Sequence, residues 1–255
     1  KNLFFVNGQF LNEEKNIDIN ELEPIFVNLP KDIDIKKIKF SSKNNFSFDI
    51  SKKLKFDNFK IKSIIQLKEL VFDKKDLKLN SYFPSFAEEI RLIKNKITIN
   101  YNKKKFDIEG SGDVSLQEKS DNLFYKINKD KNNLLFDLKM NVKNNSLLIG
   151  FLDYKKKEGL DSIVSIKGNF KKNNQLNFNS INLKEKNNEI SIKELDLNEN
   201  FKIIDIKSFN ANYVNDKNIL NDIYIKKDKS NYIIQGESFD SSSVINSIMD
   251  SDEQG

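Results

Sequence analysis

The side chains that most often carry out enzyme chemistry are missing from this sequence. Its 255 residues include no His and no Cys, which excludes zinc centres built on those side chains, thiol nucleophiles and histidine acid–base catalysis. Asp, Glu, Lys, Ser and Tyr remain, and no catalytic grouping of them stands out. We therefore predict that the chain is not an enzyme and uses no cofactor or metal ion.

Two short motifs suggest ligand binding but lack residues that such sites require. Gly110-Ser111-Gly112 resembles the start of a dinucleotide fingerprint, but the third glycine is missing and a strand, not a helix, is expected to follow. Residues 128–132 have the spacing of a calcium loop, but Lys139 stands where the bidentate Glu should be. We interpret the first segment as a turn or bulge and the second as a hairpin turn.

The formal net charge of +5 raises the question of an anionic partner. Arg91 is the only Arg, whereas proteins that read nucleic acids use arginine for bidentate contacts with bases and phosphates. Two lysine runs, 103–105 and 155–157, could meet anionic headgroups, but solvated turns are the favoured interpretation. We predict no nucleic-acid partner.

Short runs of alternating apolar and polar residues recur between Ile33 and Ile234. In a strand, such alternation sends the apolar side chains to one face and the polar ones to the other. In the clearest run, Asp137, Lys139 and Asn141 separate apolar residues. Those apolar residues are Leu134, Phe136, Leu138, Met140 and Val142.

The links between these runs are short and rich in Lys, Asn, Asp and Ser, which favours antiparallel hairpins over helical crossovers. The sequence thus predicts a mainly β fold, an extended antiparallel meander of about fifteen short strands. Open twisted sheets rarely exceed about 10 strands without curling. We therefore expect the meander to curl, either into an apolar groove or around a closed core.

Two segments have the spacing of short amphipathic helices rather than strands. Residues 82–96 carry apolar side chains at helical intervals after Pro84, and residues 240–249 do so before a polar tail, 250–255. No apolar run approaches the ~18 residues needed to span a bilayer. We expect residues 1–255 to be a single elongated β-rich segment of a longer protein.

One local segment adds a family resemblance. Residues 232–240, which read Tyr-Ile-Ile-Gln-Gly-Glu-Ser-Phe-Asp, precede the apolar pairs 244–245 and 248–249. This order of a strand, Gly236, Phe239-Asp240 and a short apolar helix resembles the closing element of a β-rich domain in the AsmA-like family (YhdP/TamB-type β-groove proteins). The motif covers under a tenth of the chain.

The resemblance implies a β-groove that binds a phospholipid or another acyl-chain ligand. It further implies a periplasmic location in a Gram-negative bacterium, a parent protein anchored in the inner membrane, and a role in phospholipid transport to the outer membrane. Residues 134, 136, 138, 140 and 142 are the predicted groove lining. The alternative from a different class is a structural or adhesive β-domain with a closed, dry core.

Overall fold

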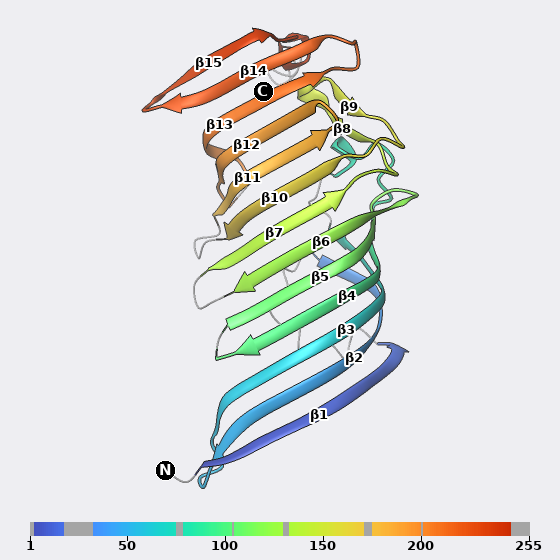
Figure 1. Cartoon of the computed structure of the whole chain (residues 1–255), viewed down its shortest axis with the longest axis vertical. Helices are drawn as coiled ribbons and strands as arrows, with labels where there is room; N and C mark the ends of the chain where they lie inside the picture. The colour runs from blue at the N-terminus through green and yellow to red at the C-terminus, as the bar shows by residue number, and fades with distance from the viewer. Residues whose placement is uncertain are drawn as a thin grey trace. The chain divides into compact units, whose positions relative to one another are not determined.

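A computed structural model of the chain describes residues 3–17, 33–74, 79–103, 105–129, 133–170, 175–199 and 201–245. These residues form fifteen strands and very little helix, which confirms the predicted mainly β meander. Thirteen strands make one sheet, in which they follow one another in chain order (Figure 1). The sheet is open, with β1 and β15 at its edges.

The strands of the large sheet are β1 (Leu3–Asn16), β2 (Ile33–Ser51), β3 (Phe56–Lys74), β4 (Ile90–Asn102), β5 (Lys105–Ser115), β6 (Ser120–Lys129), β7 (Leu134–Asn141), β10 (Ile163–Phe170), β11 (Leu176–Glu185), β12 (Asn188–Leu197), β13 (Ile203–Val214), β14 (Leu220–Asp228) and β15 (Asn231–Ser238). A separate two-stranded ribbon joins β8 (Leu147–Ile149) to β9 (Tyr154–Lys156). Two 3-10 turns complete the described elements, η1 (Leu79–Ser81) and η2 (Gly150–Leu152).

The chain divides into two compact units, and residues 117–121 and 139–255 belong to a different unit from most of the residues before them. The first unit holds β1 to β5 together with most of β6 and β7. The second unit holds β8 to β15, together with residues 78–86 and 117–121.

The first unit has longer strands than the sequence suggests. The alternating runs expected as short, separate strands between Ile33 and Phe72 merge into β2 and β3, of 19 residues each. Their pairing continues through three register shifts, for example between Ser47 and Asp49. A β-bulge lets a long strand continue where the strict two-residue alternation fails, so the polar clusters interpreted as turns are partly bulges.

The helix predicted for residues 82–96 is wrong. Ile90 begins strand β4, and the residues before it form turns in which Glu88 has a φ of 59°, outside the range of a right-handed helix. Further on, β4 has a bulge between Ile93 and Lys96, with Lys94 at a φ of 51°. The apolar residues at helical spacing come from two different structures: Phe83 and Phe86 lie in the segment before the strand, and Ile90 and Ile93 lie in β4.

The second predicted helix begins as expected. Residues 242–245 are helical, and the Ile245 amide donates a hydrogen bond of 2.9 Å to the Ser241 carbonyl. Residues 246–249 and the polar tail 250–255 lie outside the described residues.

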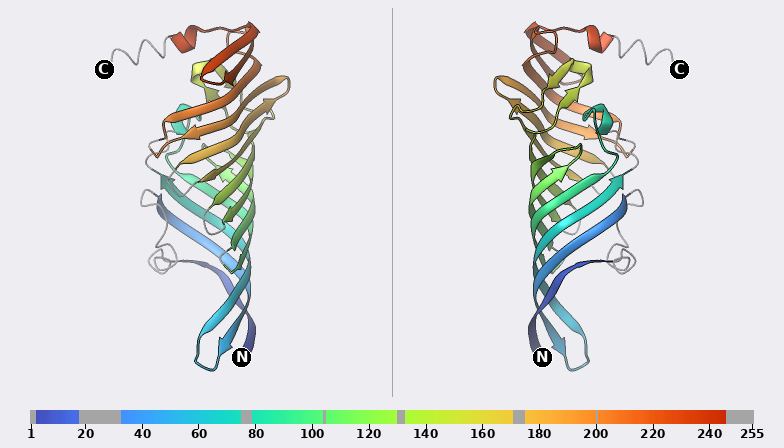
Figure 2. Two further views of the ribbon diagram at one scale, coloured as in Figure 1. Left: turned by 90° about the vertical axis from the view of Figure 1, so that its left-hand side faces the viewer. Right: turned by 90° about the vertical axis from the view of Figure 1, so that its right-hand side faces the viewer.

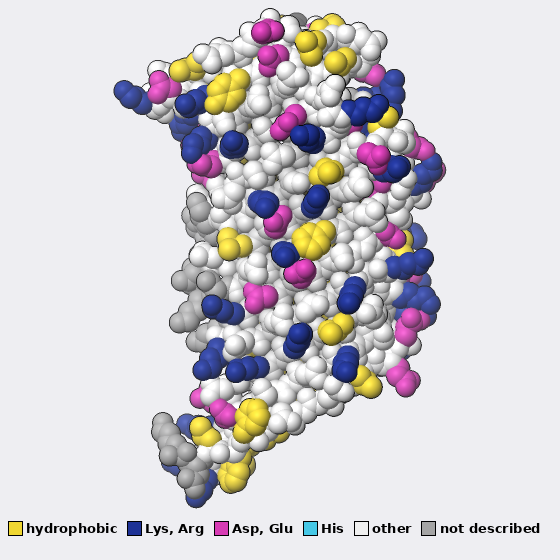
Figure 3. Space-filling view, viewed as in Figure 1, with side chains coloured by type: hydrophobic (Ala, Val, Ile, Leu, Met, Phe, Trp, Pro, Cys, Tyr) yellow, Lys and Arg dark blue, Asp and Glu magenta, His cyan; other side chains and the backbone are white. Residues whose placement is uncertain are grey.

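Cross-strand pairing separates the two faces of the sheet in the first unit. Phe46, Ile61, Tyr101 and Phe106 lie opposite one another on β2, β3, β4 and β5, so their side chains share one face. The next residues along, Asn45, Lys62, Asn100 and Asp107, also lie in register and share the other face. Figure 3 shows a face that carries many charged side chains and fewer hydrophobic ones.

Candidate functional site

The apolar face of the first unit is a continuous surface across several strands. The row of Phe46, Ile61, Tyr101 and Phe106 is half-buried. Ile99 and Ile108 pair in the neighbouring row and are half-buried as well. These strands pack mainly against their sheet neighbours, and no described element of this unit lies extensively across the face. Apolar side chains on this face keep part of their surface exposed, for example Phe10 at 50% and Phe56 at 69%.

Aromatic rings extend this surface toward one end of the strands. Phe10 and Phe46 lie 6.3 Å apart between ring centroids, Phe46 and Phe48 6.1 Å, and Phe48 and Phe56 5.3 Å. Phe59 contacts Tyr101 at 6.0 Å. Aromatic pairs at such spacings stabilise a structure by more than the burial of their surface area alone. The rings form a connected aromatic strip.

Exposure changes along β3, one of this unit's longest strands. On β3, Leu67 is 3% exposed, Ile61 is half-buried, and Phe56 reaches 69%. At the buried end, Asn95 is 1% exposed, and its side-chain amide donates to the Ile93 and Asp113 carbonyls, which holds the bulge in β4. The accessible part of the apolar face is thus the part near the β2–β3 hairpin.

In the middle of this face, the Tyr125 ring packs directly against the backbone at Gly110. A Cβ atom there would lie 2.2 Å from Cζ of Tyr125, so only glycine lets the ring lie flat on β5. Burial raises the pKa of the Tyr125 hydroxyl to about 12, because the phenolate is poorly solvated there. Tyr125 therefore stays neutral, and its ring covers the apolar face at Gly110.

The second unit carries an apolar row of its own. Ile166, Ile181, Ile192, Phe209, Ile225 and Ile234 lie opposite one another on six successive strands. In the adjacent row, Leu183, Ile190 and Ile223 are buried. The alternation recognised in the sequence thus produces an apolar face in this unit as well.

A packed cluster covers one end of the strands in the second unit. Tyr154 and Tyr213 are each 1% exposed and meet edge to face, with centroids 5.8 Å apart. The Tyr154 hydroxyl donates to the Glu185 carboxylate at 2.6 Å, and the Tyr213 hydroxyl donates to the Leu152 carbonyl at 2.8 Å. Burial raises the pKa of both hydroxyls, that of Tyr213 to about 12. Both rings are therefore neutral anchors between the β8–β9 ribbon and the sheet.

Lys156 is the most unusual member of this cluster because its side chain is fully buried. Its ammonium donates to the Lys143 carbonyl at 2.9 Å and to the Asn145 carbonyl at 2.6 Å. Burial lowers the pKa of Lys156, while the nearby Asp121 and Glu185 carboxylates oppose that shift. Asp121 accepts hydrogen bonds from the Lys143 and Asn144 amides and from Asn145. These hydrogen bonds and nearby carboxylates compensate for the burial of the ammonium, so Lys156 has a structural role.

The groove residues predicted from the sequence divide between two environments. Leu134, Phe136, Leu138 and Met140 are half-buried at alternate positions of β7, while Leu135 between them is 50% exposed. Val142 follows the strand and is fully buried, with its amide donating to the Ser162 carbonyl. Val142 therefore belongs to the packed part of the molecule.

The motif behind the family resemblance occupies the last strand and the turn after it. A Cβ atom at Gly236 would lie 2.1 Å from the Asp222 carbonyl oxygen, so this position of β15 requires glycine. Phe239 is half-buried. Asp240 accepts hydrogen bonds from the amide and hydroxyl of Ser242 at the start of the helical turn. Those bonds and Lys217 lower the pKa of Asp240 to about 2.

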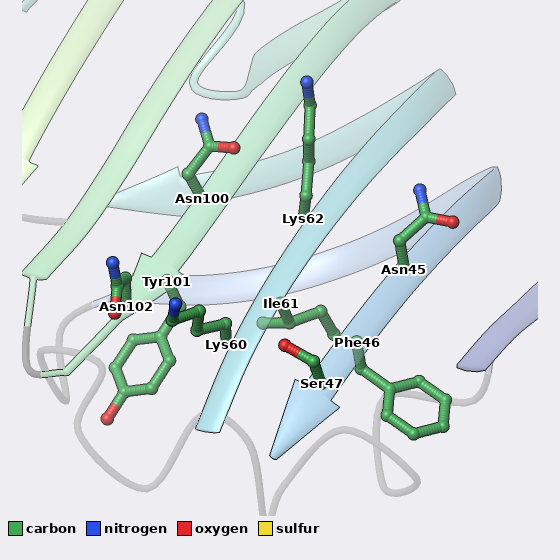
Figure 4. A pocket seen from close by; sticks show the side chains of 9 residues that line it. All are labelled: Asn45, Phe46, Ser47, Lys60, Ile61, Lys62, Asn100, Tyr101 and Asn102. Atoms are coloured by element: carbon green, nitrogen blue, oxygen red, sulfur yellow. The ribbon is translucent and has the colours of Figure 1, made fainter. Parts of the chain in front are cut away.

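The polar face of the first unit holds a depression of about 350 Å³. Lys60 and Lys62 line it beside Asn45, Asn100 and Asn102. Figure 4 shows Asn45, Lys62 and Asn100 extending side by side from neighbouring strands. Among the described residues neither lysine forms an ion pair. Both lysines are exposed, and charge interactions in full contact with solvent are weak, so the depression is a poor anion site.

Sequence reasoning missed β1 and its aromatic residues. Phe4, Val6 and Phe10 share the apolar face with β2, because they lie opposite Ile50, Phe48 and Asn44. The period-two signal was present, since Asn7 and Gln9 alternate with apolar neighbours. The strand also explains Gly8, where a Cβ atom would lie 2.5 Å from the Phe46 ring.

Fold and site together define an open, single-layer antiparallel sheet whose first unit presents an accessible apolar face. Comparison with protein-family models, with curated proteins and with solved structures returned no match. Within the described residues, no helix has the length and apolar character needed to cross a bilayer.

Proposed function

We propose that this chain is a non-enzymatic module that binds the acyl chains of phospholipids along its apolar face. The observation that carries the proposal is the accessible apolar surface of β1 to β5, with half-buried side chains in register across strands. An acyl chain of ~15 methylenes gains on the order of 12 kcal/mol on leaving water. A continuous apolar lining can provide that environment.

The wider role rests on the resemblance to AsmA-like proteins. The strand, the required Gly236, Phe239-Asp240 and the helical turn follow one another as that motif implies, which supports the resemblance. We propose on this basis that the chain takes part in phospholipid movement between the inner and outer membranes, in the periplasm, as part of a protein anchored in the inner membrane.

A photo-crosslinking experiment tests acyl-chain binding. A photoreactive amino acid placed at Phe136 or Ile99 should label phospholipid in cells, because both side chains lie on the half-buried apolar side of their strands. Leu135 is the matched control: it neighbours Phe136 but points to the opposite face and is 50% exposed. Lipid extraction and mass spectrometry identify the adduct.

Two results would count against the proposal. Equal labelling from Leu135 and Phe136 would show non-specific contact with lipid. No lipid adduct from either Phe136 or Ile99, with no phospholipid extracted from the purified protein, would favour the structural or adhesive β-domain with a dry core.

A further inference from the structure

The β2–β3 hairpin projects beyond its neighbour in the first unit. Pairing between β3 and β4 stops at Lys60 opposite Asn102, whereas β2 and β3 remain paired as far as Ile50 and Phe56. β1 accompanies them, with Leu3 opposite Ser51. Figure 2 shows the hairpin extending beside the start of β1. We call residues 3–6 and 48–59 the tip.

Large apolar side chains are unusually exposed at the tip. The exposed fraction is 74% for Leu54, 69% for Phe56, 67% for Phe5 and 59% for Phe4. Phe4 and Phe5 are consecutive residues of a strand, so they project from opposite faces. Apolar side chains on both faces of an edge strand cannot all be explained by packing on one side of the sheet.

Leu54 occupies a backbone position that does not suit it. Its φ is 56°, a left-handed conformation that is unfavourable for a bulky side chain. Residues 215–219 form the same hydrogen-bonded turn in the second unit, and there the left-handed position is held by Asn218, with a φ of 62°. The turn therefore does not need leucine, and strain at an exposed apolar residue points to a role outside folding.

Lysines surround this apolar tip. Lys52, Lys53 and Lys55 are exposed and form no ion pair with another described residue. The carboxylates that flank the turn in sequence, those of Asp49 and Asp57, each accept a hydrogen bond from Asn58. The lysines of the turn thus remain available for an external anion.

We propose that the tip docks on the surface of an anionic lipid bilayer, with Leu54 and Phe56 entering the headgroup boundary and Lys52, Lys53 and Lys55 contacting lipid phosphates. Interfacial binding combines buried apolar side chains with electrostatic attraction to anionic lipids. Both features occur together at the tip, and its lysines complement an anionic surface. Docking at the tip does not depend on acyl-chain binding along the apolar face.

Vesicle co-sedimentation of the full chain tests this proposal. Binding to phosphatidylcholine vesicles with about one third phosphatidylglycerol should exceed binding to pure phosphatidylcholine by about tenfold or more, and salt should weaken it. The double variant Leu54→Asn/Phe56→Ser should lose about tenfold in binding to either vesicle. The triple variant Lys52→Gln/Lys53→Gln/Lys55→Gln should lose the preference for phosphatidylglycerol.

The matched control is Phe201→Asn. Phe201 is also left-handed and 61% exposed in an equivalent turn, but Glu199 stands beside it and Lys202 is the only lysine of that turn. Phe201→Asn should bind vesicles within twofold of wild type, roughly the scatter of such assays. A urea unfolding curve for each variant separates loss of binding from loss of folding.

Three outcomes would overturn the proposal. The first is no binding of the wild-type chain to either vesicle. The second is an equal loss of binding for Phe201→Asn and Leu54→Asn/Phe56→Ser. The third is a tip variant that abolishes self-association on size exclusion but leaves vesicle binding unchanged, which would make the tip an interface between copies of this chain.

Discussion

At the scale of single residues, the molecule combines a buried polar cluster with an accessible apolar surface. In the second unit, Tyr154, Lys156, Glu185 and Tyr213 are almost fully buried, and every one has a hydrogen-bond partner. Such a cluster specifies one arrangement because each polar group left without a partner would destabilise the fold. Sequence reasoning did not identify this cluster, since its members come from segments far apart in the chain.

Lys156→Met should destabilise the protein by about 3 kcal/mol. The substitution keeps the length of the side chain but leaves the Lys143 and Asn145 carbonyls without their donor, and it removes the positive charge near Asp121. Lys155→Met, at an exposed position of the same strand, is the matched control. Urea unfolding measures both free energies of unfolding. Equal effects of the two substitutions would show that the buried ammonium contributes no net stability.

The buried tyrosines predict unfolding at alkaline pH. Because the folded-state pKa of Tyr125 and of Tyr213 is about 12, against 10 for the free side chain, the unfolded chain binds fewer protons between pH 10 and 12. Each tyrosine should therefore lower the free energy of unfolding by ~1.4 kcal/mol per pH unit in that window, and neither should affect it below pH 9.

Tyr125→Phe isolates this effect in equilibrium unfolding measured at several pH values. The variant should show a shallower fall in stability above pH 10 than wild type. Tyr82→Phe, at a ring that is 48% exposed, serves as the control and should keep the wild-type slope. Parallel curves for wild type and Tyr125→Phe would contradict the prediction.

At the scale of elements, the hairpin turns 51–55, 198–202 and 215–219 share one hydrogen-bonding pattern. In each, the first side chain accepts from the fifth amide and the fourth residue is left-handed. Those fourth residues are Leu54, Phe201 and Asn218. Asn tolerates this conformation better than Leu or Phe because its short polar side chain forms local hydrogen bonds.

Leu54→Asn should stabilise the protein by about 0.5–1 kcal/mol, since it relieves the left-handed strain and removes a side chain that is already in solvent. The reciprocal change Asn218→Leu should destabilise it by a similar amount. Urea midpoints of both variants give the comparison. If Leu54→Asn is the less stable chain, Leu54 makes a packing contribution that its exposure does not reveal.

The period-two alternation was enough to predict the mainly β meander, but it could not predict the lengths of its elements. Between Ile33 and Lys74 the register shifts interrupt the alternation without ending a strand. The helix predicted for residues 82–96 had another cause, since its apolar residues come partly from the turns before β4 and partly from β4 itself. Bulges depend on pairing with a neighbouring strand, which a local pattern does not contain.

The candidate site was predictable to a similar extent. The half-buried side of β7 follows from Leu134, Phe136 and Leu138, because alternation assigns the face directly. The burial of Val142 does not follow, since it depends on a contact with Ser162 twenty residues later in the chain. The tip was also missed, because exposure depends on where β4 stops pairing with β3.

At the scale of the whole molecule, most strands pack extensively only against their neighbours in the sheet. Where strands contact mainly their neighbours, stability is the sum of the stability of each strand and of its contacts with those neighbours, and it varies along the chain. β15 has a single partner, and all eight of its residues are exposed. β13 has partners on both sides and holds the buried residues Phe209, Ala211 and Tyr213.

Amide hydrogen exchange followed by mass spectrometry should show this gradient. We expect the slowest exchange in β13 and the fastest exchange among the sheet strands in the edges β1 and β15. Gly236→Ala should speed exchange in β15, because the added Cβ atom would meet the Asp222 carbonyl. Uniform protection from β13 to β15 would instead indicate that this part of the sheet opens as one cooperative unit.

The nearest-neighbour packing of the strands also affects how such a protein can evolve. Duplication or deletion of one complete hairpin adds or removes two antiparallel strands and preserves the direction and the alternation of those that follow. On the polar face, Lys, Asn and Ser can replace one another with little effect on stability, because substitutions at exposed positions are nearly neutral. Related chains can therefore change in length and diverge widely in sequence while keeping one apolar face.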